Sequence, residues 1–394
     1  MKEGWKINTL KELSIISGDY GLSVPSKPFD GVRYLRITDI TNSGDLNDDK
    51  VSANIENKKQ EELQEGDVLF ARTGATVGKT LVFRKEFGEC LYAGYLIRYR
   101  LNKDIILPRY MHYITHSNEY YDWVATNQEA AAQPNISAKK YNLLPVRYPS
   151  LEEQQRIVSY LDAAFAQIDV LKANEGKQLD EARKLFQKAL EEAMKPKEGW
   201  KEKTLKEIGL TQTGTTPSKA DANNYGDYIP FIRPSEIDID DCGSIDYDSE
   251  IKLSERGLNV GRLFKKHSIL MVCIGATISK VGFCSQDVSC NQQINVLTPK
   301  TDYDYKFVYY AMRNKNFKNK VIKEGTSAQA TLPIINKGKW ERLSIFCPSI
   351  EVQQKIVASL DALSANIKKL EEVQRKTVAE CDALKQAMLR EVFE

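Results

Sequence analysis

The most suggestive chemistry lies in GATVGKT at 74–80, whose glycines and lysine are the residue types that cradle phosphate groups. Three residues separate Gly74 from Gly78, whereas a phosphate-binding loop has four between its glycines. The related segment GATISK at 275–280 lacks the second glycine altogether. Because the backbone amides of such a cradle depend on this spacing, we predict a strand-flanking turn at both places and no ATP site.

Histidines and acidic residues also fall short of a catalytic constellation. His112 and His116 are four residues apart, which on a helix would place both imidazoles on one face for a metal. No Glu follows His112, and His267 is the only other histidine. The tripeptide at 250–252 echoes the E-x-K of some nucleases without further carboxylates to support a metal. The sequence has no nucleotide-type glycine turn and no adenine-methylation motif. We therefore predict no catalytic residue and no metal site.

Composition places the chain among ordinary globular proteins. Its 394 residues suffice for two or three domains, and 42% apolar with 28% charged residues is typical of such domains. The net charge of +2 does not indicate nucleic-acid binding by itself. No apolar stretch is long enough for a membrane span and the start lacks a signal peptide, so we expect a cytoplasmic protein. Seven cysteines without a C-x-x-C pair predict reduced, mostly buried thiols.

The sequence contains an internal repeat. KEGWKINTLKE at 2–12 returns as KEGWKEKTLKE at 197–207, and PSLEEQQRIVSYLDAAFAQI at 149–168 returns as PSIEVQQKIVASLDALSANI at 348–367. Weaker matches pair YLRITDI at 34–40 with FIRPSEI at 231–237, and RTGATVGK at 72–79 with CIGATISK at 273–280. The offset stays between 195 and 201 residues, which predicts two halves of similar fold.

Each half begins with short apolar runs between Gly, Pro, Asn and Asp turns, a pattern typical of strands in a curled sheet. We expect one helix of moderate length in each of these parts, around Pro108–Val124 and Tyr305–Lys318. The rest of each half lacks proline and is rich in strong helix formers. The predicted fold class is α+β, with mixed α/β domains at 1–150 and 196–349 and long helices at 151–195 and 350–394.

Both long helices carry apolar residues at a spacing of three or four, as in a coiled-coil seam. The predicted seams are Leu161, Ala164, Ile168, Leu171, Ala182, Leu185 and Ala189, and Ile356, Leu360, Leu363, Ile367, Leu370, Cys381, Leu384 and Met388. Their middle layers turn polar, at Glu175 and Gln178 and at Gln374 and Thr377. Antiparallel pairing brings these polar layers together, as a pseudo-twofold axis between the halves requires, whereas a stagger would bury them at a cost of about a few kcal/mol. We expect an antiparallel rod of roughly 65 Å that separates the two domains.

Several segments resemble those of a known family. AQPNISAKKYNLLPVRYPSLEEQQRIVSYLD at 132–162 and AQATLPIINKGKWERLSIFCPSIEVQQKIVASLD at 328–361 are similar to the end of a type I restriction target-recognition domain entering its helical conserved region. The segments 213–238, 65–79 and 290–299 resemble further blocks of the same domain. The first half departs at 17–40, which carries another loop and no Thr-Pro-Ser. That divergence is where the two domains would differ in the sequence they read.

The resemblance covers essentially the whole chain and implies a non-catalytic specificity subunit of a type I restriction-modification system. Such a subunit binds double-stranded DNA and two methyltransferase subunits, and reaches the translocase-nuclease subunits through the methyltransferases. Each domain reads one half of a bipartite site, and the helices set the gap between the halves. Because the domains differ in sequence, the site would be asymmetric. S-adenosylmethionine, ATP and magnesium would belong to partner subunits, so no cofactor is expected in this chain.

Base readout needs bidentate donors and acceptors, with hydroxyls for phosphates, on loops that reach a groove. The predicted DNA contacts of the first domain are Ser23, Ser26, Lys27, Arg36, Arg72, Thr76, Lys79 and Gln133. Those of the second are Thr213, Thr215, Thr216, Ser218, Lys219, Asn223, Asn224, Tyr225, Arg233, Lys280 and Gln292. The loop at 213–225 is the first choice. Residues of these types also build turns and helix caps without contacting any ligand.

Two other classes of function stay open at this point. A self-contained DNA methyltransferase or nuclease would need S-adenosylmethionine or a metal bound by this chain alone. A coiled-coil adaptor without DNA recognition fits the long helices, since periodicity alone is equally typical of a dimerisation rod or a spacer. The adaptor leaves the duplicated α+β domains without a purpose.

Overall fold

The computed structural model describes residues 4–55, 62–128, 134–238, 243–248, 251–326 and 332–394. It divides into two compact units, Met1–Asn174 with Arg375–Glu394, and Glu175–Gln374. Each unit combines one mixed domain with parts of both long helices, α4 (Leu151–Ala193) and α10 (Ile350–Phe393). We refer to residues 1–150 as domain 1 and to residues 196–349 as domain 2.

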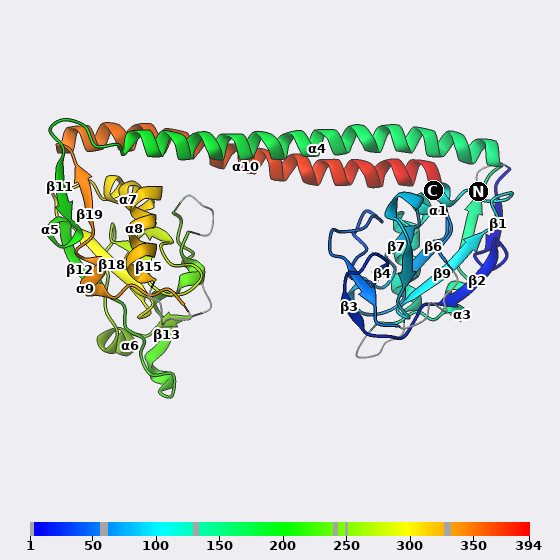
Figure 1. Ribbon diagram of the computed structural model, residues 1–394, viewed down its shortest axis with the longest axis horizontal. Helices are drawn as coiled ribbons and strands as arrows, with labels where there is room; N and C mark the ends of the chain where they lie inside the picture. The colour runs from blue at the N-terminus through cyan, green and yellow to red at the C-terminus, as the bar shows by residue number, and fades with distance from the viewer. Residues whose placement is uncertain (1–3, 56–61, 129–133, 239–242, 249–250, 327–331) are drawn as a thin grey trace. The chain divides into compact units, whose positions relative to one another are not determined.

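Domain 1 is organised around a four-stranded antiparallel sheet in the order β2-β9-β6-β7 (Figure 1). Alternate residues of its central strands pack into two different cores, because successive side chains of a strand point to opposite faces of the sheet. Phe70 and Ile97 pack in the core that includes the short helices, whereas Leu69 and Leu96 pack in a second core on the other face. The elements of domain 1 are β1 Lys6–Thr9, β2 Ser14–Tyr20, β3 Ser26–Pro28, β4 Arg33–Leu35, β5 Val51–Ala53, β6 Val68–Ala71, β7 Thr80–Val82, β8 Cys90–Tyr92, β9 Leu96–Leu101, α1 Pro108–Ile114, α2 Asn118–Asn127, α3 Ala138–Tyr141 and β10 Pro145–Tyr148.

Domain 2 has the same plan, with a four-stranded antiparallel sheet in the order β12-β18-β15-β16. The pairing of β1 with β10 is matched by that of β11 with β19, and the parallel pairing of β4 with β8 by that of β13 with β17. The elements of domain 2 are β11 Lys201–Thr204, α5 Leu205–Ile208, β12 Gly209–Thr213, β13 Tyr225–Ile232, β14 Lys252–Leu253, α6 Glu255–Val260, β15 Ile269–Val272, β16 Val281–Phe283, β17 Ser289–Cys290, β18 Ile294–Pro299, α7 Tyr305–Arg313, α8 Lys315–Gly325, α9 Lys337–Trp340 and β19 Ser344–Cys347. The α+β class and the duplicated plan predicted from the sequence are therefore confirmed.

The helix predicted near the end of each mixed domain is in fact a pair of shorter helices. The prediction of single helices at Pro108–Val124 and Tyr305–Lys318 was wrong, because a polar capping residue interrupts each one. Ser117 accepts a hydrogen bond from the backbone of Tyr120 and starts α2. Asn314 does the same for α8 through the backbone of Asn316.

The long helices pack against each other in opposite directions within each unit. In the unit that holds domain 1, Asp169 pairs with Lys385 at 2.6 Å and Lys172 with Asp382 at 2.7 Å. Residue numbers thus rise along α4 as they fall along α10, as antiparallel helices require. In the other unit Arg183 of α4 pairs with Glu371 of α10 at 2.7 Å. The predicted antiparallel pairing is confirmed.

The apolar seam differs from the predicted one in several positions. On α4, Leu161, Ile168, Leu179, Phe186 and Leu190 are buried. Leu171 and Leu185, which the spacing assigned to the seam, are 46% and 66% exposed. On α10, Leu363 and Leu384 are likewise exposed, whereas Leu360, Ile367 and Cys381 are buried. The helices therefore present leucines to their surface in addition to those in the seam.

A glycine in the interior of α4 gives a first testable prediction. The nearest atom to an added Cβ at Gly176 would be Gln374 Nε2 at 3.7 Å, an ordinary contact distance. We expect Gly176→Ala to raise the free energy of unfolding by about 0.5–1 kcal/mol, because glycine weakens a helix interior. Urea unfolding measures the change. Gly214→Ala is the contrasting control, since its Cβ would lie 2.1 Å from Asn291 O and should destabilise the chain.

Within the part of the chain that the structure describes, no helix is both long and apolar enough to cross a membrane.

The cysteines in the described part of the chain are free and buried, as predicted: Cys90, Cys273, Cys284, Cys290, Cys347 and Cys381. Burial raises the pKa of the Cys90 and Cys273 thiols to about 11. These thiols stay protonated and unreactive at neutral pH. Cys242 lies outside the described residues.

Candidate nucleic-acid interface

Four segments of domain 1 meet at one end of its four-stranded sheet, where β2 and β6 end and β9 begins. We call the surface that they form, residues 20–23, 72–76, 93–95 and 134–136, rim 1. Backbone hydrogen bonds of 2.8–3.0 Å hold these segments in place: Leu22 N bonds to Tyr92 O at the end of β8, Arg72 N to Tyr95 O, Gly74 N to Pro134 O and Ile136 N to Arg72 O. Loops held on a rigid sheet in this way are suited to recognition.

Domain 2 builds the same rim from equivalent positions. We call residues 213–216, 273–277, 291–293 and 333–335 rim 2. The corresponding backbone bonds, also of 2.8–3.0 Å, are Thr215 N to Cys290 O, Cys273 N to Gln293 O, Gly275 N to Pro333 O and Ile335 N to Cys273 O. Gly21 and Gly214 take the same place in the two rims, where an added Cβ would lie within 2.5 Å of a backbone carbonyl oxygen.

The side chains of the two rims differ. In rim 1, Tyr20 and Tyr95 are exposed, and the Arg72 guanidinium lies 4.9 Å from the centre of the Tyr20 ring. Asn135 Oδ1 accepts a hydrogen bond from Arg72 Nε at 3.2 Å, which orients the guanidinium. A stacked and oriented arginine of this kind suits phosphate or guanine recognition.

Rim 2 carries hydroxyl and amide groups in place of these aromatic rings. Thr216 donates its hydroxyl hydrogen to the side chain of Gln292, so two predicted contacts lie together. Thr213 donates to Asn295 Oδ1 at 2.8 Å, and its carbonyl accepts from the Arg262 guanidinium at 2.7 Å. The predicted contacts Thr213, Thr215, Thr216 and Gln292 are thus brought together on one surface.

The loop that follows rim 2 is folded by two of the residues predicted to contact DNA. Tyr225 donates its hydroxyl hydrogen to Pro217 O at 2.8 Å, and Asn224 Nδ2 donates to Ser218 O at 3.1 Å. Asn224 is buried, whereas Ser218, Lys219 and Asn223 are exposed. The exposed three are therefore the members of this loop that face solvent, and the Asn223 amide already donates to Asp221 Oδ1 at 3.1 Å.

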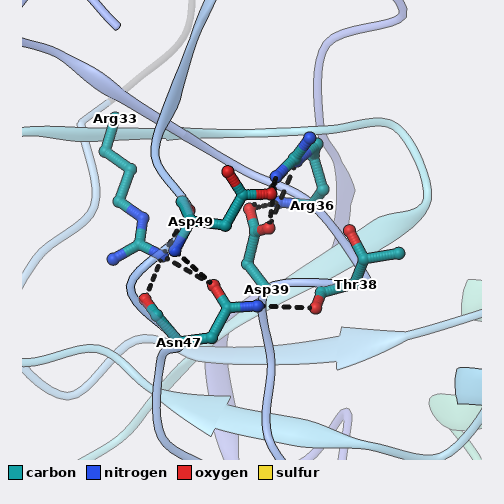
Figure 2. A network of polar contacts seen from close by, with 6 residues as sticks. All are labelled: Arg33, Arg36, Thr38, Asp39, Asn47 and Asp49. Atoms are coloured by element: carbon teal, nitrogen blue, oxygen red, sulfur yellow. Dashed lines mark hydrogen bonds and ion pairs between the residues drawn. The ribbon is translucent and has the colours of Figure 1, made fainter. Parts of the chain in front are cut away.

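Arg36 and Arg233 occupy equivalent turns and are bound to carboxylates. Arg36 Nη2 lies 2.7 Å from Asp39 Oδ1 and 2.7 Å from Asp49 Oδ2, within the network of Figure 2. The hydrogen bond to the buried Asp39 raises the pKa of Arg36. Arg233 lies 2.5 Å from Glu236 in the same way. DNA contact by either arginine stays a prediction, and it would have to compete with these ion pairs.

The remaining predicted contacts are more scattered. Ser23 and Thr76 belong to rim 1, whereas Lys79 lies outside it and donates to Ile40 O at 3.3 Å. Lys280 follows the turn of rim 2 and is partly exposed. Ser26 and Lys27 lie on β3, and Lys27 pairs with Asp30 at 2.6 Å. Gln133 lies outside the described residues.

Sequence reasoning did not single out Tyr20, Tyr95, Asn135 or Arg262, which the structure brings to the rims. The only signal for Tyr95 in the sequence is its place after Gly94, within the run LYAGYLI. Tyr20 and Asn135 carry no such signal, because their proximity to Arg72 arises from pairing between distant segments.

The turn at 74–80 does not offer its amides to a phosphate. Gly74 N donates to Pro134 O, Gly78 N to Ala71 O at 3.0 Å and Lys79 N to Thr76 O at 3.0 Å. These bonds are those of a strand-flanking turn with a 3₁₀ segment at Gly74–Thr76, as predicted. Among the described residues, no group of three or more His, Cys, Asp or Glu side chains is arranged to hold a metal ion. Glu250 lies outside the described residues.

The buried His112 and the half-buried His116 form a pair on and just after α1. Their ring centres are 4.3 Å apart, and His116 Nδ1 lies 2.7 Å from His112 O. Burial lowers the pKa of His112 well below its usual value and also lowers the pKa of His116; Arg109 adds to both effects. Asp169, Lys172, Asp382 and Lys385 line the same cavity. Both imidazoles are therefore neutral at physiological pH.

This pair predicts acid sensitivity of folding. Below the ordinary histidine pKa of about 6.5, these two histidines bind protons in the unfolded chain but not in the folded chain. We expect stability to fall as the pH drops below that value, by up to about 1.4 kcal/mol per pH unit for each histidine. Urea unfolding from pH 8 to pH 5 should show a weaker pH dependence in a His112→Gln/His116→Gln variant than in the wild type. His267 is exposed but its pKa is also lowered, so His267→Asn is the comparison and should weaken the dependence less than the double variant does.

Comparisons with known proteins identify the family of the chain. Residues 2–181 and 197–380 each match the type I restriction modification DNA specificity domain. The type I restriction enzyme HindI specificity subunit of Haemophilus influenzae is 22% identical, over 90% of this chain and 94% of its own length.

Two solved structures share the fold along the whole chain. One comes from work on the complex assembly and conformational transition of the type I R-M system; it is 18% identical, covers 100% of this chain and 98% of its own, and has a TM-score of 0.77. The HsdS subunit from Thermoanaerobacter tengcongensis is 17% identical, covers 100% and 97%, and has a TM-score of 0.53. With two matched domains that span most of its length, the chain belongs to the DNA specificity subunits of type I restriction-modification systems.

Proposed function

We propose that each domain reads one half of an asymmetric, two-part DNA site through its rim. The observation that carries this proposal is that one backbone framework occurs twice with different side chains. Arg72 and Tyr95 of rim 1 take the positions of Cys273 and Gln293 in rim 2, as the matching backbone bonds show. Equal frameworks would present both rims to DNA in the same way, while unequal side chains would select different bases.

The long helices would hold the two readers at a set separation and bind two methyltransferase subunits. Exposed apolar side chains on a helix outside its own seam favour packing against a further protein. Leu171 and Leu384 provide such a surface in one unit, and Leu185, Leu363 and Val373 in the other. S-adenosylmethionine, ATP and magnesium would be bound by the methyltransferase and translocase-nuclease subunits, with the latter attached through the former.

Methylation profiling of the source genome tests this proposal. We expect one split motif, with two unlike specific halves and a spacer of fixed length, that disappears when the gene for this chain is deleted. The purified chain without partners serves as the control and should neither methylate nor cleave DNA. A continuous or palindromic motif, or modification by the chain alone, would contradict the proposal.

A further inference from the structure

A buried glutamine joins domain 1 to the first turn of α4. Gln154 is 0% exposed, and its Oε1 accepts from Leu107 N at 2.9 Å. Its Nε2 donates to Ile105 O at 2.9 Å and to Pro149 O at 3.0 Å. All three polar contacts of this side chain therefore go to the backbone of domain 1: two to residues just before α1 and one to Pro149, just before α4. A glutamine so placed cannot turn away without leaving buried groups unpaired.

A second contact, eight residues further along α4, joins that helix to α1 itself. Asp162 accepts a hydrogen bond from the Tyr113 hydroxyl and another from Arg109 Nε at 2.8 Å. Eight residues of helix correspond to about 12 Å. Two attachments this far apart fix the angle between α1 and α4, whereas a single attachment would allow domain 1 to rotate about it relative to α4.

Domain 2 repeats both attachments. Gln353 is 1% exposed, accepts from Asp304 N at 3.0 Å and donates to Pro348 O at 3.0 Å. Asp361 accepts from the Tyr310 hydroxyl at 2.8 Å and pairs with Lys306 at 2.5 Å. The glutamine, the aspartate and the tyrosine are retained in both halves, although the side chains of the rims differ. These two attachments between a domain and its long helix are therefore suited to positioning the domain rather than to choosing bases.

We propose that Gln154 and Gln353, with Asp162 and Asp361, are positioning residues that set the spacer length the protein accepts. This inference rests on the proposed two-part readout. A domain about 30 Å deep that tilts by about 10° on its helix moves its far edge by about 5 Å. One base pair of DNA rises by about 3.4 Å, so a loosened attachment brings a site with one base pair more or fewer within reach.

The test uses the full chain co-purified with its methyltransferase subunits. Initial methylation rates are measured on duplexes with both native half-sites and a spacer that is native, one base pair longer or one base pair shorter. We expect Gln154→Met and Gln353→Met each to raise the rate on altered spacers, relative to the native one, by about fivefold or more. The exposed neighbours, as Gln155→Met and Gln354→Met, are matched controls and should leave the ratio unchanged. Discrimination against a base change within either half-site should stay at the wild-type level.

Three results separate this inference from its premise. If the wild-type complex shows no preference for one spacer, the two-part readout fails and the inference fails with it. If the wild type is selective and both glutamine variants stay equally selective, only the inference is overturned. If half-site discrimination falls together with spacer selectivity, the residues act on general folding and the inference is again overturned.

Tyr113→Phe is a second variant that tests the same proposal if a glutamine variant does not fold. It removes only the hydroxyl that reaches Asp162 and leaves the ring against Phe165, at 5.4 Å between centres. We expect a smaller shift in the same direction, with Tyr121→Phe as the control. An unchanged spacer ratio in a folded Tyr113→Phe complex would overturn the proposal.

Discussion

Leu171→Glu and Leu185→Glu are each expected to remove one of the two methyltransferase subunits from the assembled complex, and the double variant to remove both. These leucines are 46% and 66% exposed and lie in different units. A carboxylate placed in an apolar interface costs several kcal/mol, whereas the same change on a free surface stays within about 0.5 kcal/mol. The chain itself should therefore stay folded while binding is lost.

Co-purification with a tagged methyltransferase subunit, followed by native mass spectrometry, measures the number of subunits bound. Gln187→Glu adds the same charge at an exposed position on a different side of α4 and should retain both subunits. Thermal unfolding of each variant should match the wild type within a few degrees. A double variant that keeps two methyltransferase subunits would show that they dock elsewhere.

The repeated blocks made the architecture predictable from the sequence. PSLEEQQRIV and PSIEVQQKIV predict two helices of the same kind, and the structure explains the shared glutamine, since Gln154 and Gln353 both bind backbone groups of their domain. The seam was harder to assign. Leu185 and Phe186 are adjacent in sequence and both fit a spacing of three or four, yet only Phe186 is buried. Spacing alone cannot choose between neighbouring apolar stripes when a helix carries more than one.

The rims could be predicted only in part, because they are assembled from distant segments. Arg72, Thr216 and Gln292 were found from their residue types in loops. Tyr20 was not, since its position beside Arg72 follows from the pairing of β2 with β9 and of β9 with β6. Arg36 and Arg233 illustrate the reverse case. Their residue type suits base contact, but nearby carboxylates bind them in the fold.

Arg72→Ala is expected to relax one base position in the half-site read by domain 1 and to leave the other half-site unchanged. Asn135 holds Nε and the Tyr20 ring supports the guanidinium, so its two terminal nitrogens can form the bidentate pair that a guanine accepts. Such a pair contributes about 1–3 kcal/mol of discrimination, or roughly 5- to 150-fold in relative affinity.

Competition binding of the complex to duplexes with single base changes measures this effect. Gln292→Ala is the equivalent substitution in domain 2 and should relax a base position in the other half-site. Arg156→Ala, which removes an exposed arginine from α4, is the control and should leave the whole motif intact. A phosphate contact at Arg72 would behave differently, because it would weaken binding to every sequence alike and lower the salt dependence. Uniform weakening would therefore assign Arg72 to the DNA backbone, and relaxation in the half-site of domain 2 would contradict the pairing of each rim with its own half.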